Sequence, residues 1–230
     1  MEIFGLEKLS LVDFDGYVAS TIFTGTCNFR CGFCHNALLV LDSKNLPIIK
    51  EETVLEYLHQ KKKILDGVCI TGGEPTLQKD LPNFLEKVRE TGLKIKLDTN
   101  GTNPTLVKSL VENGLVDYFA IDIKNDKENY ASIIGFDKYD TSKVEQTVDY
   151  LISNDLDYEF RTTLINEFHK EDNIKRIGEW IKGAKKYFMQ KFKPGENCIS
   201  GGLTEVKEEK AKEFLSVISP FVQSAKLRGY

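Results

Sequence analysis

Apolar runs and amphipathic stretches alternate along the whole chain. Six short apolar runs have the length of buried strands, and most of the stretches between them place apolar residues at helical spacing. The predicted strands are 18–23, 67–71, 93–97, 118–123, 158–164 and 186–191. The predicted helices are 51–63, 80–90, 171–182 and 205–217, together with one that begins at Asn103-Pro104 and ends at Asn113-Gly114 and one that begins around Ser142 and includes Ile152. Strands that alternate with helices in this way are typical of parallel sheets joined by helical crossovers.

Two of the predicted helices carry start signals. Asn103 followed by Pro104 predicts an N-cap with proline at the first helical position. Ser142 and Glu145 have the spacing of a capping box, in which each side chain bonds to the other's backbone.

The number of strand–helix units indicates the fold class. About six units are too few for a closed eight-stranded barrel, so we predict an α/β fold of the open, partial (β/α)6 TIM-like barrel type. The 230 residues contain no repeat and no linker-like segment, and we expect a single domain over residues 1–230. Residues 192–203 form the one long irregular stretch, rich in glycine, and we expect 192–230 to close the barrel.

Composition and charge narrow the choice of function. A net charge of −4 gives no electrostatic reason to expect a nucleic-acid partner. No apolar run is long enough to cross a membrane, and the first residues lack the pattern of a signal peptide. We therefore expect a cytoplasmic protein, in which reduced cysteines more often bind metal or catalyse than form disulfides. Three of the five cysteines lie in one short loop.

That loop, residues 24–36, is called here the cysteine loop. Its Cys27, Cys31 and Cys34 have the spacing C-x3-C-x2-C, which allows three thiolates to turn toward one metal centre. Three thiolates can hold three irons of a [4Fe-4S] cluster and leave the fourth iron open for another ligand. A Cys3His zinc site with His35 as fourth ligand is the alternative, because zinc uses the same soft ligands. His35 directly follows Cys34, which is a poor spacing for both to reach one ion.

Further polar motifs fall at the predicted strand ends, where parallel α/β folds bind their ligands. They are Gly72, Gly73, Glu74 and Pro75 after the second strand, Asp98, Thr99 and Asn100 at the third, Asp122 and Lys124 at the fourth, Arg161 within the fifth, and Gln190 near the end of the sixth. Each has a plainer interpretation: a glycine pair forms turns, acids cap helices, and an arginine can face solvent.

The functional interpretation of these motifs rests on their chemistry. Gly72 and Gly73 allow a backbone to approach a ligand closely, because no Cβ intervenes. Asp98 and Asp122 would be two carboxylates near one ligand. Arg161 needs an anionic partner if it faces the barrel interior.

The cysteine loop resembles the signature of the radical S-adenosylmethionine (SAM) enzymes, in which an aromatic residue, here Phe33, precedes the last cysteine. The extension to Cys34-His35-Asn36 and the Gln-Lys-Phe-x-Pro pattern at 190–194 resemble the activases of glycyl-radical enzymes, and most of all those of anaerobic ribonucleoside-triphosphate reductases. The resemblance covers roughly residues 6–195. It implies an oxidoreductase that cleaves SAM reductively at a [4Fe-4S] cluster and generates a glycyl radical on a partner enzyme.

The resemblance also implies roles for the strand-end residues. Gly72-Gly73-Glu74-Pro75 would bind the methionyl ammonium group of SAM, and Lys124 would contact SAM. The equivalents of Asp98, Thr99 and Asp122 help to hold a monovalent cation, Na⁺ or K⁺, beside the SAM carboxylate. The remaining residues expected to line the cofactor are Phe33, His35, Asn36, Asn100, Arg161 and Gln190. A histidine that meets SAM in the formate-lyase activases has no counterpart in residues 187–194.

The chain is short and leaves little material to enclose a small substrate. We therefore expect a peptide loop of a glycyl-radical enzyme, most plausibly anaerobic ribonucleotide reductase, as substrate and a flavodoxin or ferredoxin as electron donor. Two alternatives stay open at this point: a radical SAM enzyme acting on a small molecule or peptide, and a zinc-stabilised binding protein without catalysis.

Overall fold

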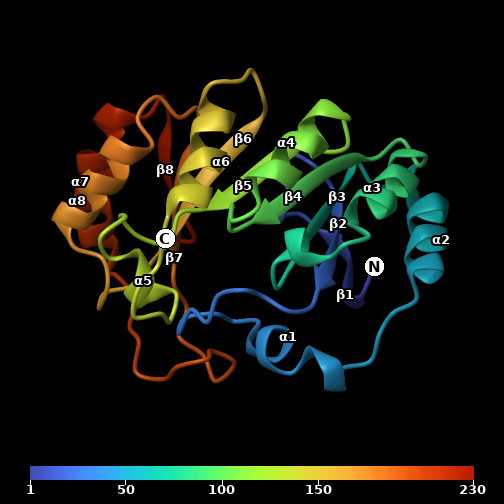
Figure 1. Ribbon diagram of the computed structural model, residues 1–230, viewed down its shortest axis with the longest axis horizontal. Coiled ribbons are helices and arrows are strands. Elements are labelled where there is room, and N and C mark those ends of the chain that lie inside the picture. The colour runs from blue at the N-terminus through green and yellow to red at the C-terminus, as the bar shows by residue number, and fades with distance from the viewer. The chain divides into compact units, whose positions relative to one another are not determined.

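A computed structural model describes all of residues 1–230 and contains eight strands and eight α-helices (Figure 1). The strands are β1 (Ile3–Ser10), β2 (Ala19–Thr24), β3 (Gly67–Gly72), β4 (Lys94–Thr99), β5 (Tyr118–Asp122), β6 (Tyr158–Leu164), β7 (Tyr187–Lys191) and β8 (Ala225–Arg228). The helices are α1 (Ala37–Leu41), α2 (Glu51–Lys61), α3 (Leu81–Arg89), α4 (Pro104–Glu112), α5 (Tyr130–Ile133), α6 (Ser142–Ile152), α7 (Glu171–Trp180) and α8 (Glu208–Ile218).

The strands follow one another in the sheet in their order along the chain, from β1 to β8. β1 is antiparallel to β2, whereas the pairs β2–β3, β3–β4, β6–β7 and β7–β8 are parallel. The sheet is therefore mixed, and its order does not close on itself. This confirms the predicted open α/β fold, with the six predicted strands as β2 to β7.

The chain divides into two compact units, each described here by itself. The first contains Met1–Asn28, Leu38–Thr99 and Asn103–Phe119, and the second contains Phe29–Ala37, Asn100–Thr102 and Ala120–Tyr230. The division passes through β5 and through the cysteine loop. That the chain forms a single domain stays a prediction.

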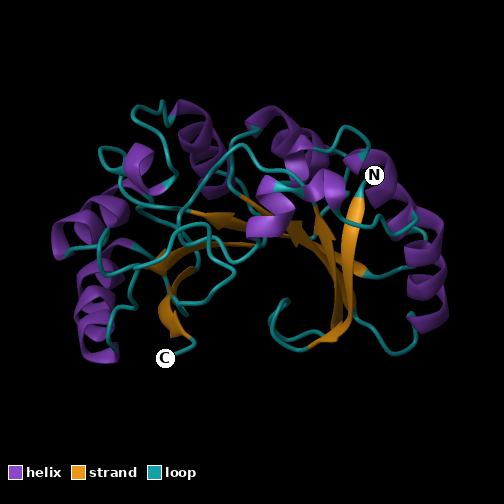
Figure 2. Ribbon diagram, turned by 90° about the horizontal axis from the view of Figure 1, so that it is seen from below, coloured by secondary structure: helices purple, strands orange, loops and turns teal.

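In the first unit, helices α2 and α3 lie next to each other beside the strands β2 to β4 (Figures 1 and 2). Strand β3 is apolar through Val68, Cys69 and Ile70, all of which are fully buried. Helix α3 turns Phe84, Leu85 and Val88 inward, as its helical spacing predicts, and these side chains are also fully buried. The core of this unit therefore lies between the strands and these helices.

In the second unit, helices α7 and α8 pack side by side, and α8 also contacts β8 (Figure 1). Strand β6 alternates in its environment: Tyr158, Phe160 and Leu164 are buried in the apolar core, whereas Arg161 is partly exposed. Successive side chains of a strand point to opposite faces, so β6 presents its charged residues on the face away from the helices.

The structure corrects three predictions about secondary structure. Strands β1 and β8 were not expected, because most residues of β1 are at least partly exposed and β8 has only four residues. Helix α8 begins at Glu208 rather than Glu205, since Glu205 forms an isolated bridge with Ile165.

The predicted N-cap at Asn103 is confirmed, and its side chain accepts a hydrogen bond from Leu106 N at 3.2 Å. The predicted capping box at Ser142 is wrong. Thr141 is the N-cap residue of α6, and its hydroxyl donates to Glu145 Oε1 at 2.5 Å. None of the helices combines the length and the apolar character that crossing a membrane would require.

Candidate functional site

The cysteine loop begins directly after β2, and its first part belongs to the first unit. Thr26, immediately before Cys27, is the single non-glycine residue with a positive φ, at 60°. Its amide donates to Leu39 O at 2.8 Å, which ties the loop to α1. A left-handed conformation is costly for a β-branched residue, so the loop holds Cys27 in a defined place at some expense of strain.

Cys31 and Cys34 belong to the second unit, where a turn joins them through a hydrogen bond from Cys34 N to Cys31 O of 3.0 Å. Burial raises the pKa of the Cys31 thiol to about 11, although the nearby ammonium of Lys124 opposes this effect. Burial also raises the pKa of Cys34, against a backbone hydrogen bond from Asn36 and the charge of Lys124. In the absence of iron, both thiols are therefore protonated at neutral pH.

Phe33 and His35 project from the same turn. The buried ring of Phe33 lies beneath the Lys124 ammonium, with 5.6 Å from Nζ to the ring centroid. His35 Nε2 lies 2.7 Å from the carbonyl oxygen of Lys193, and its ring stacks on Phe192. A carbonyl can only accept, so Nε2 carries the proton in this contact.

The irregular stretch 192–203 lies against the cysteine loop. Ser200 N donates to Gly32 O at 2.8 Å, and Cys198 Sγ lies 3.8 Å from Phe33 O. A Cβ added to Gly32 would approach Ser200 Oγ to 2.9 Å, so any larger residue here would require the Ser200 side chain to move. The stretch was predicted to be irregular, but its contact with the cysteine loop has no signal in the sequence.

Gly72 and Gly73 end β3 in the first unit, next to the start of the cysteine loop. Gly72 has a φ of +116°, and a Cβ at Gly73 would lie 1.8 Å from Thr26 O. Gly73 N and Glu74 N donate to Thr24 O and Thr26 O at 2.9 and 2.7 Å. The two glycines are needed because the backbone has no room for a side chain here, at Gly72 against the end of β2 and at Gly73 against the start of the cysteine loop.

Glu74 is nearly fully buried, and its Oε1 atom accepts several hydrogen bonds. Thr76 donates from its hydroxyl at 2.5 Å and its amide at 3.1 Å, and Thr99 Oγ1 donates at 2.6 Å. Pro75 then starts a single 3₁₀ turn. The structure thus brings together Glu74 and Thr99, two residues that the sequence placed at different strand ends.

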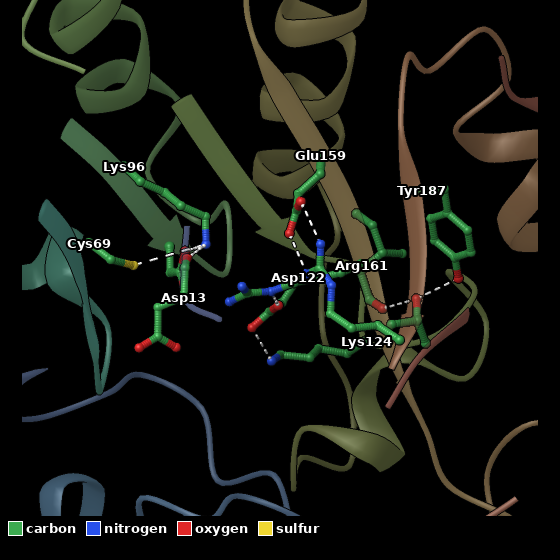
Figure 3. A network of polar contacts seen from close by, with 12 residues as sticks. Asp13, Cys69, Lys96, Asp122, Lys124, Glu159, Arg161 and Tyr187 are labelled. Carbon is green, nitrogen blue, oxygen red and sulfur yellow. Dashed lines mark hydrogen bonds and ion pairs between the residues drawn. The ribbon is translucent and has the colours of Figure 1, made fainter. Parts of the chain in front are cut away.

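A buried lysine that the sequence interpretation missed lies beside Asp98. Lys96 on β4 is 4% exposed, and its ammonium lies 2.8 Å from Asp98 Oδ1, 2.7 Å from Asp13 O and 4.0 Å from Cys69 Sγ (Figure 3). The sequence does contain a signal for this pair: Lys96 and Asp98 are two residues apart on one strand, so their side chains lie on the same face. A buried charge of this kind is retained only with a charged or polar partner, which Asp98 provides.

Asn100 and Gly101 form a turn, as their residue types predict. The Asn100 side-chain oxygen accepts from Thr102 N at 3.1 Å and Thr102 Oγ1 at 2.7 Å. Gln190 lies on β7 in register with Thr163 of β6 and Arg228 of β8.

Asp122 is the centre of the charged group of the second unit (Figure 3). Its Oδ2 atom lies 2.9 Å from the Lys124 ammonium, and its Oδ1 atom forms an ion pair with Arg161 Nε. Burial alone would raise the pKa of Asp122, but Arg161 and Lys124 together hold it well below its usual range. Burial lowers the pKa of Lys124, yet Asp122 raises it above its usual range. All three groups are therefore charged at neutral pH.

The sequence interpretation also missed an ion pair between Glu159 on β6, the strand that carries Arg161, and Arg228 on β8. Glu159 on β6 is almost fully buried, and both of its carboxylate oxygens accept from the guanidinium of Arg228, at 2.9 and 3.1 Å. That guanidinium also lies over the ring of Phe188, 3.7 Å from its centroid. Three elements, β6, β7 and β8, are linked by this stacked pair.

The predicted residues and their partners thus fall into three groups. In the first unit the structure brings together Gly72, Gly73, Glu74 and Thr99, and separately Lys96 with Asp98. In the second unit it brings together Cys31, Cys34, Phe33, Lys124, Asp122 and Arg161. The three loop thiols supply the soft donor set that an iron–sulfur cluster uses. No group of three or more histidine, cysteine, aspartate or glutamate side chains stands in a geometry ready for a metal ion.

A family model, the radical SAM superfamily, matches residues 21–181. The chain belongs to the radical SAM superfamily. The match spans the cysteine loop, the glycine pair and the Asp122 group. The family implies a [4Fe-4S] cluster and SAM as cofactors, and the donor set of Cys27, Cys31 and Cys34 fits that cluster.

Relatives within the superfamily have more than one activity. A protein of Methanocaldococcus jannaschii whose name assigns it to the glycyl-radical enzyme activating enzymes is 29% identical over 97% of this chain and 94% of its own length. The pyruvate formate-lyase-activating enzyme of Clostridium pasteurianum is 31% identical over 58% of this chain and 57% of its own. The 7-carboxy-7-deazaguanine synthase of Thermoplasma acidophilum is 25% identical over 70% and 78%.

A solved structure supports the fold. SuiB of Streptococcus suis, in its structure bound to SAM, superimposes with a TM-score of 0.70 over 90% of this chain and 49% of SuiB, at 14% sequence identity. The two chains therefore share this fold over most of the present chain.

Proposed function

We propose that this protein is a radical SAM activase that generates a glycyl radical on a partner enzyme, and that the partner is anaerobic ribonucleotide reductase. One observation carries the proposal: the similarity to the Methanocaldococcus jannaschii protein extends over nearly the whole of both chains. The Cys34-His35-Asn36 and Gln-Lys-Phe-x-Pro stretches support the choice of partner.

In this proposal Cys27, Cys31 and Cys34 hold a [4Fe-4S] cluster, each binding a different iron. The cluster and bound SAM supply the one-electron cleavage of the sulfonium, after which a hydrogen atom is taken from the substrate. The chain's part is to position both groups and to exclude water. The high pKa values of the Cys31 and Cys34 thiols mean that cluster binding must release their protons.

The charged group of the second unit is suited to the carboxylate end of SAM. Lys124 lies close enough to Cys31 and Cys34 to influence the pKa of both, and its ammonium rests on the Phe33 ring. Asp122 keeps that ammonium charged and in place, and Arg161 binds the other oxygen of the same carboxylate. We infer that Lys124 contacts the SAM carboxylate, and that Arg161 acts both on SAM and as a partner of Asp122.

The ammonium end of SAM is assigned to Gly72-Gly73-Glu74-Pro75. The glycine backbone has no side chain to block a ligand, and buried Glu74 supplies negative charge. Phe33, His35, Asn36, Asn100 and Gln190 are proposed to line the rest of the cofactor.

A monovalent cation, Na⁺ or K⁺, is proposed to bind between Asp98, Thr99 and Asp122. Asp98 already pairs with Lys96, and Asp122 pairs with Lys124 and Arg161. A bound cation would therefore share these carboxylates with the ammonium groups, and its affinity should be modest. SAM binding measured in sodium and in potassium buffers tests this site.

The hydrogen donor is proposed to be a backbone Cα–H of a glycine in the partner. A glycyl radical is stabilised by delocalisation over its two flanking amides, which makes that hydrogen a favourable target. The partner glycine has to move out of a buried position in its own enzyme to reach the site. The contact should therefore be transient and of modest area. The electron donor is proposed to be a flavodoxin or ferredoxin, and the compartment the cytoplasm.

The deciding experiment is electron paramagnetic resonance. The reductase is incubated anaerobically with this protein, SAM and a reductant, and a doublet that collapses when the glycine α-position is deuterated supports the proposal. A Cys31→Ala variant and a reductase with its radical glycine replaced by alanine are the matched controls. If no protein radical forms, and a small metabolite drives SAM turnover, the assignment moves to a small-molecule enzyme.

That second candidate has one observation in its favour. The 7-carboxy-7-deazaguanine synthase of Thermoplasma acidophilum is similar over 70% of the chain. Its name indicates a small-molecule product, so a purine-like compound is the first metabolite to test.

A further inference from the structure

Cys198 lies next to a proposed cluster ligand and takes no part in the proposed function. Its Sγ atom is 3.8 Å from the carbonyl oxygen of Phe33, which belongs to the peptide group that joins Phe33 to Cys34. Cys34 is the next residue along the chain, and both Cys34 and Cys198 are partly exposed. The two thiols are therefore neighbours, although 163 residues separate them in the sequence.

The segment that carries Cys198 is held in place by backbone contacts on both sides. Ser200 N donates to Gly32 O at 2.8 Å, and His35 Nε2 reaches Lys193 O at 2.7 Å. Cys198 N itself donates to Gly195 O at 3.2 Å, which forms a turn before the thiol. Both flanks of the segment are therefore anchored on the cysteine loop, which places the Cys198 thiol near Cys34.

Accessibility distinguishes this pair from the other cysteines of the second unit. Cys34 and Cys198 are partly exposed, whereas Cys31 is 6% exposed. Thiol–disulfide exchange needs a thiol that a small oxidant can reach. Cys34 has Cys31 as a second neighbour, but a reagent reaches Cys31 less easily than it reaches Cys198.

We propose that Cys34 and Cys198 form a disulfide when the cysteine loop carries no cluster. In exchange with a small-molecule disulfide, one of the two thiolates attacks a sulfur of the reagent and releases one small thiol. The second cysteine then attacks the mixed disulfide and releases the other small thiol, so that two S–H bonds are lost and one protein S–S bond forms. The reagent is reduced by two electrons and takes up both protons.

The bond would give Cys34 a reversible protected form. A cluster lost to an oxidant exposes its ligand thiols, and further oxidation to a sulfinic acid is irreversible for most cysteines. A disulfide with Cys198 can be reduced again, after which Cys34 is once more able to bind iron. The inference concerns the radical SAM cysteine loop and does not depend on which substrate the enzyme has.

The test uses the full-length, cluster-free protein treated with oxidised glutathione under anaerobic conditions. Peptide mapping by mass spectrometry without reduction should recover a linked pair of peptides that contain Cys34 and Cys198, and the protein should lose two titratable thiols. The Cys198→Ser variant should lose the linked pair, and the Cys69→Ser variant, at a fully buried cysteine, should keep it. The cluster-loaded protein should form no such link.

Two results would overturn the proposal. One is a disulfide that joins Cys34 only to Cys27 or Cys31, with Cys198 recovered as a thiol or as its glutathione adduct. The other is a loss of iron by the Cys198→Ser variant after anaerobic reconstitution, since that would make Cys198 a ligand. Circular dichroism of each variant shows whether it has folded, and if Cys198→Ser does not fold, the mapping of the unaltered protein still decides.

Discussion

Asp122 and Arg161 form an ion pair between residues of β5 and β6, and both side chains are mostly buried. Lys124 shares the same carboxylate. Replacing Asp122 by alanine removes the group that keeps two buried cations in place, and we expect the free energy of unfolding to fall by about 3–5 kcal/mol. Urea denaturation of the cluster-free protein measures this change.

The control for that experiment is Asp155→Ala. Asp155 is fully exposed and pairs with Lys185 at 2.7 Å, so its loss should leave the free energy of unfolding almost unchanged. Equal effects of the two substitutions would mean that the Asp122 group contributes no more to stability than a surface pair.

A second prediction concerns pH and the buried His169. Its Nδ1 accepts from Ile165 N at 2.9 Å, its Nε2 lies 3.0 Å from Lys124 O, and burial lowers its pKa below 6.5. The unfolded chain therefore binds the proton more readily than the folded one. This contribution to stability is complete above about pH 6.5 and is lost as the pH falls below that value.

Unfolding of the cluster-free protein at pH 7.5 and pH 5.5 tests this prediction. The His169→Gln variant should be less stable at pH 7.5 by about 1–3 kcal/mol, because buried groups lose a hydrogen-bond partner. It should also lose less stability than the natural protein between the two pH values. An unchanged pH dependence in the variant would show that His169 is not the group responsible.

The third prediction identifies the cluster ligands. Replacing Cys27, Cys31 or Cys34 by alanine should abolish iron binding and SAM cleavage, because each thiolate is proposed to hold a different iron. Cys69→Ala and Cys198→Ala should retain the iron content of the natural protein after anaerobic reconstitution. Iron analysis and the visible absorption band measure this, and a brown protein with a broad band also excludes zinc as the sole metal.

The fourth prediction concerns the glycine pair after β3. A Cβ at Gly73 would lie 1.8 Å from Thr26 O, so Gly73→Ala must push the backbone after β3 away from the cysteine loop. We expect SAM to bind at least about tenfold more weakly, which corresponds to roughly 1.4 kcal/mol, as measured by equilibrium dialysis with the cluster in place. Gly195→Ala is the matched control, because a Cβ at Gly195 meets nothing within 4 Å. Equal SAM affinities in the two variants would argue against a role for this backbone.

Helices and strands could be predicted from the sequence where burial of one face requires a regular pattern of apolar residues. Strand β3 and helix α3 are apolar on the faces that they bury, and both were recognised. Strand β1 was missed because most of its residues are at least partly exposed and its apolar positions do not alternate cleanly. The four residues of β8 are too few to establish a period.

The site was predictable where a motif has a required spacing, and less so where it depends on pairing between distant residues. The cysteine spacing and the glycine pair could be recognised from adjacent residues. The partners of Asp98 and Asp122 could not, because an ion pair between strands depends on register and on which face each residue occupies. Arg161 was expected to find an anion, and the anion that the structure shows is Asp122.

Each of the three hydrogen bonds described between the stretch 192–203 and the cysteine loop includes at least one main-chain atom. Ser200 contributes its amide, Lys193 its carbonyl oxygen, and Gly32 and Phe33 their carbonyl oxygens. Main-chain atoms are the same in almost every residue type. The sequence of this stretch can therefore differ widely between homologues while the same main-chain contacts are kept. A search for these contacts in other radical SAM proteins should therefore compare backbone paths and the presence of glycine at position 32. The amino-acid sequence of the stretch itself is a poor guide to the contacts.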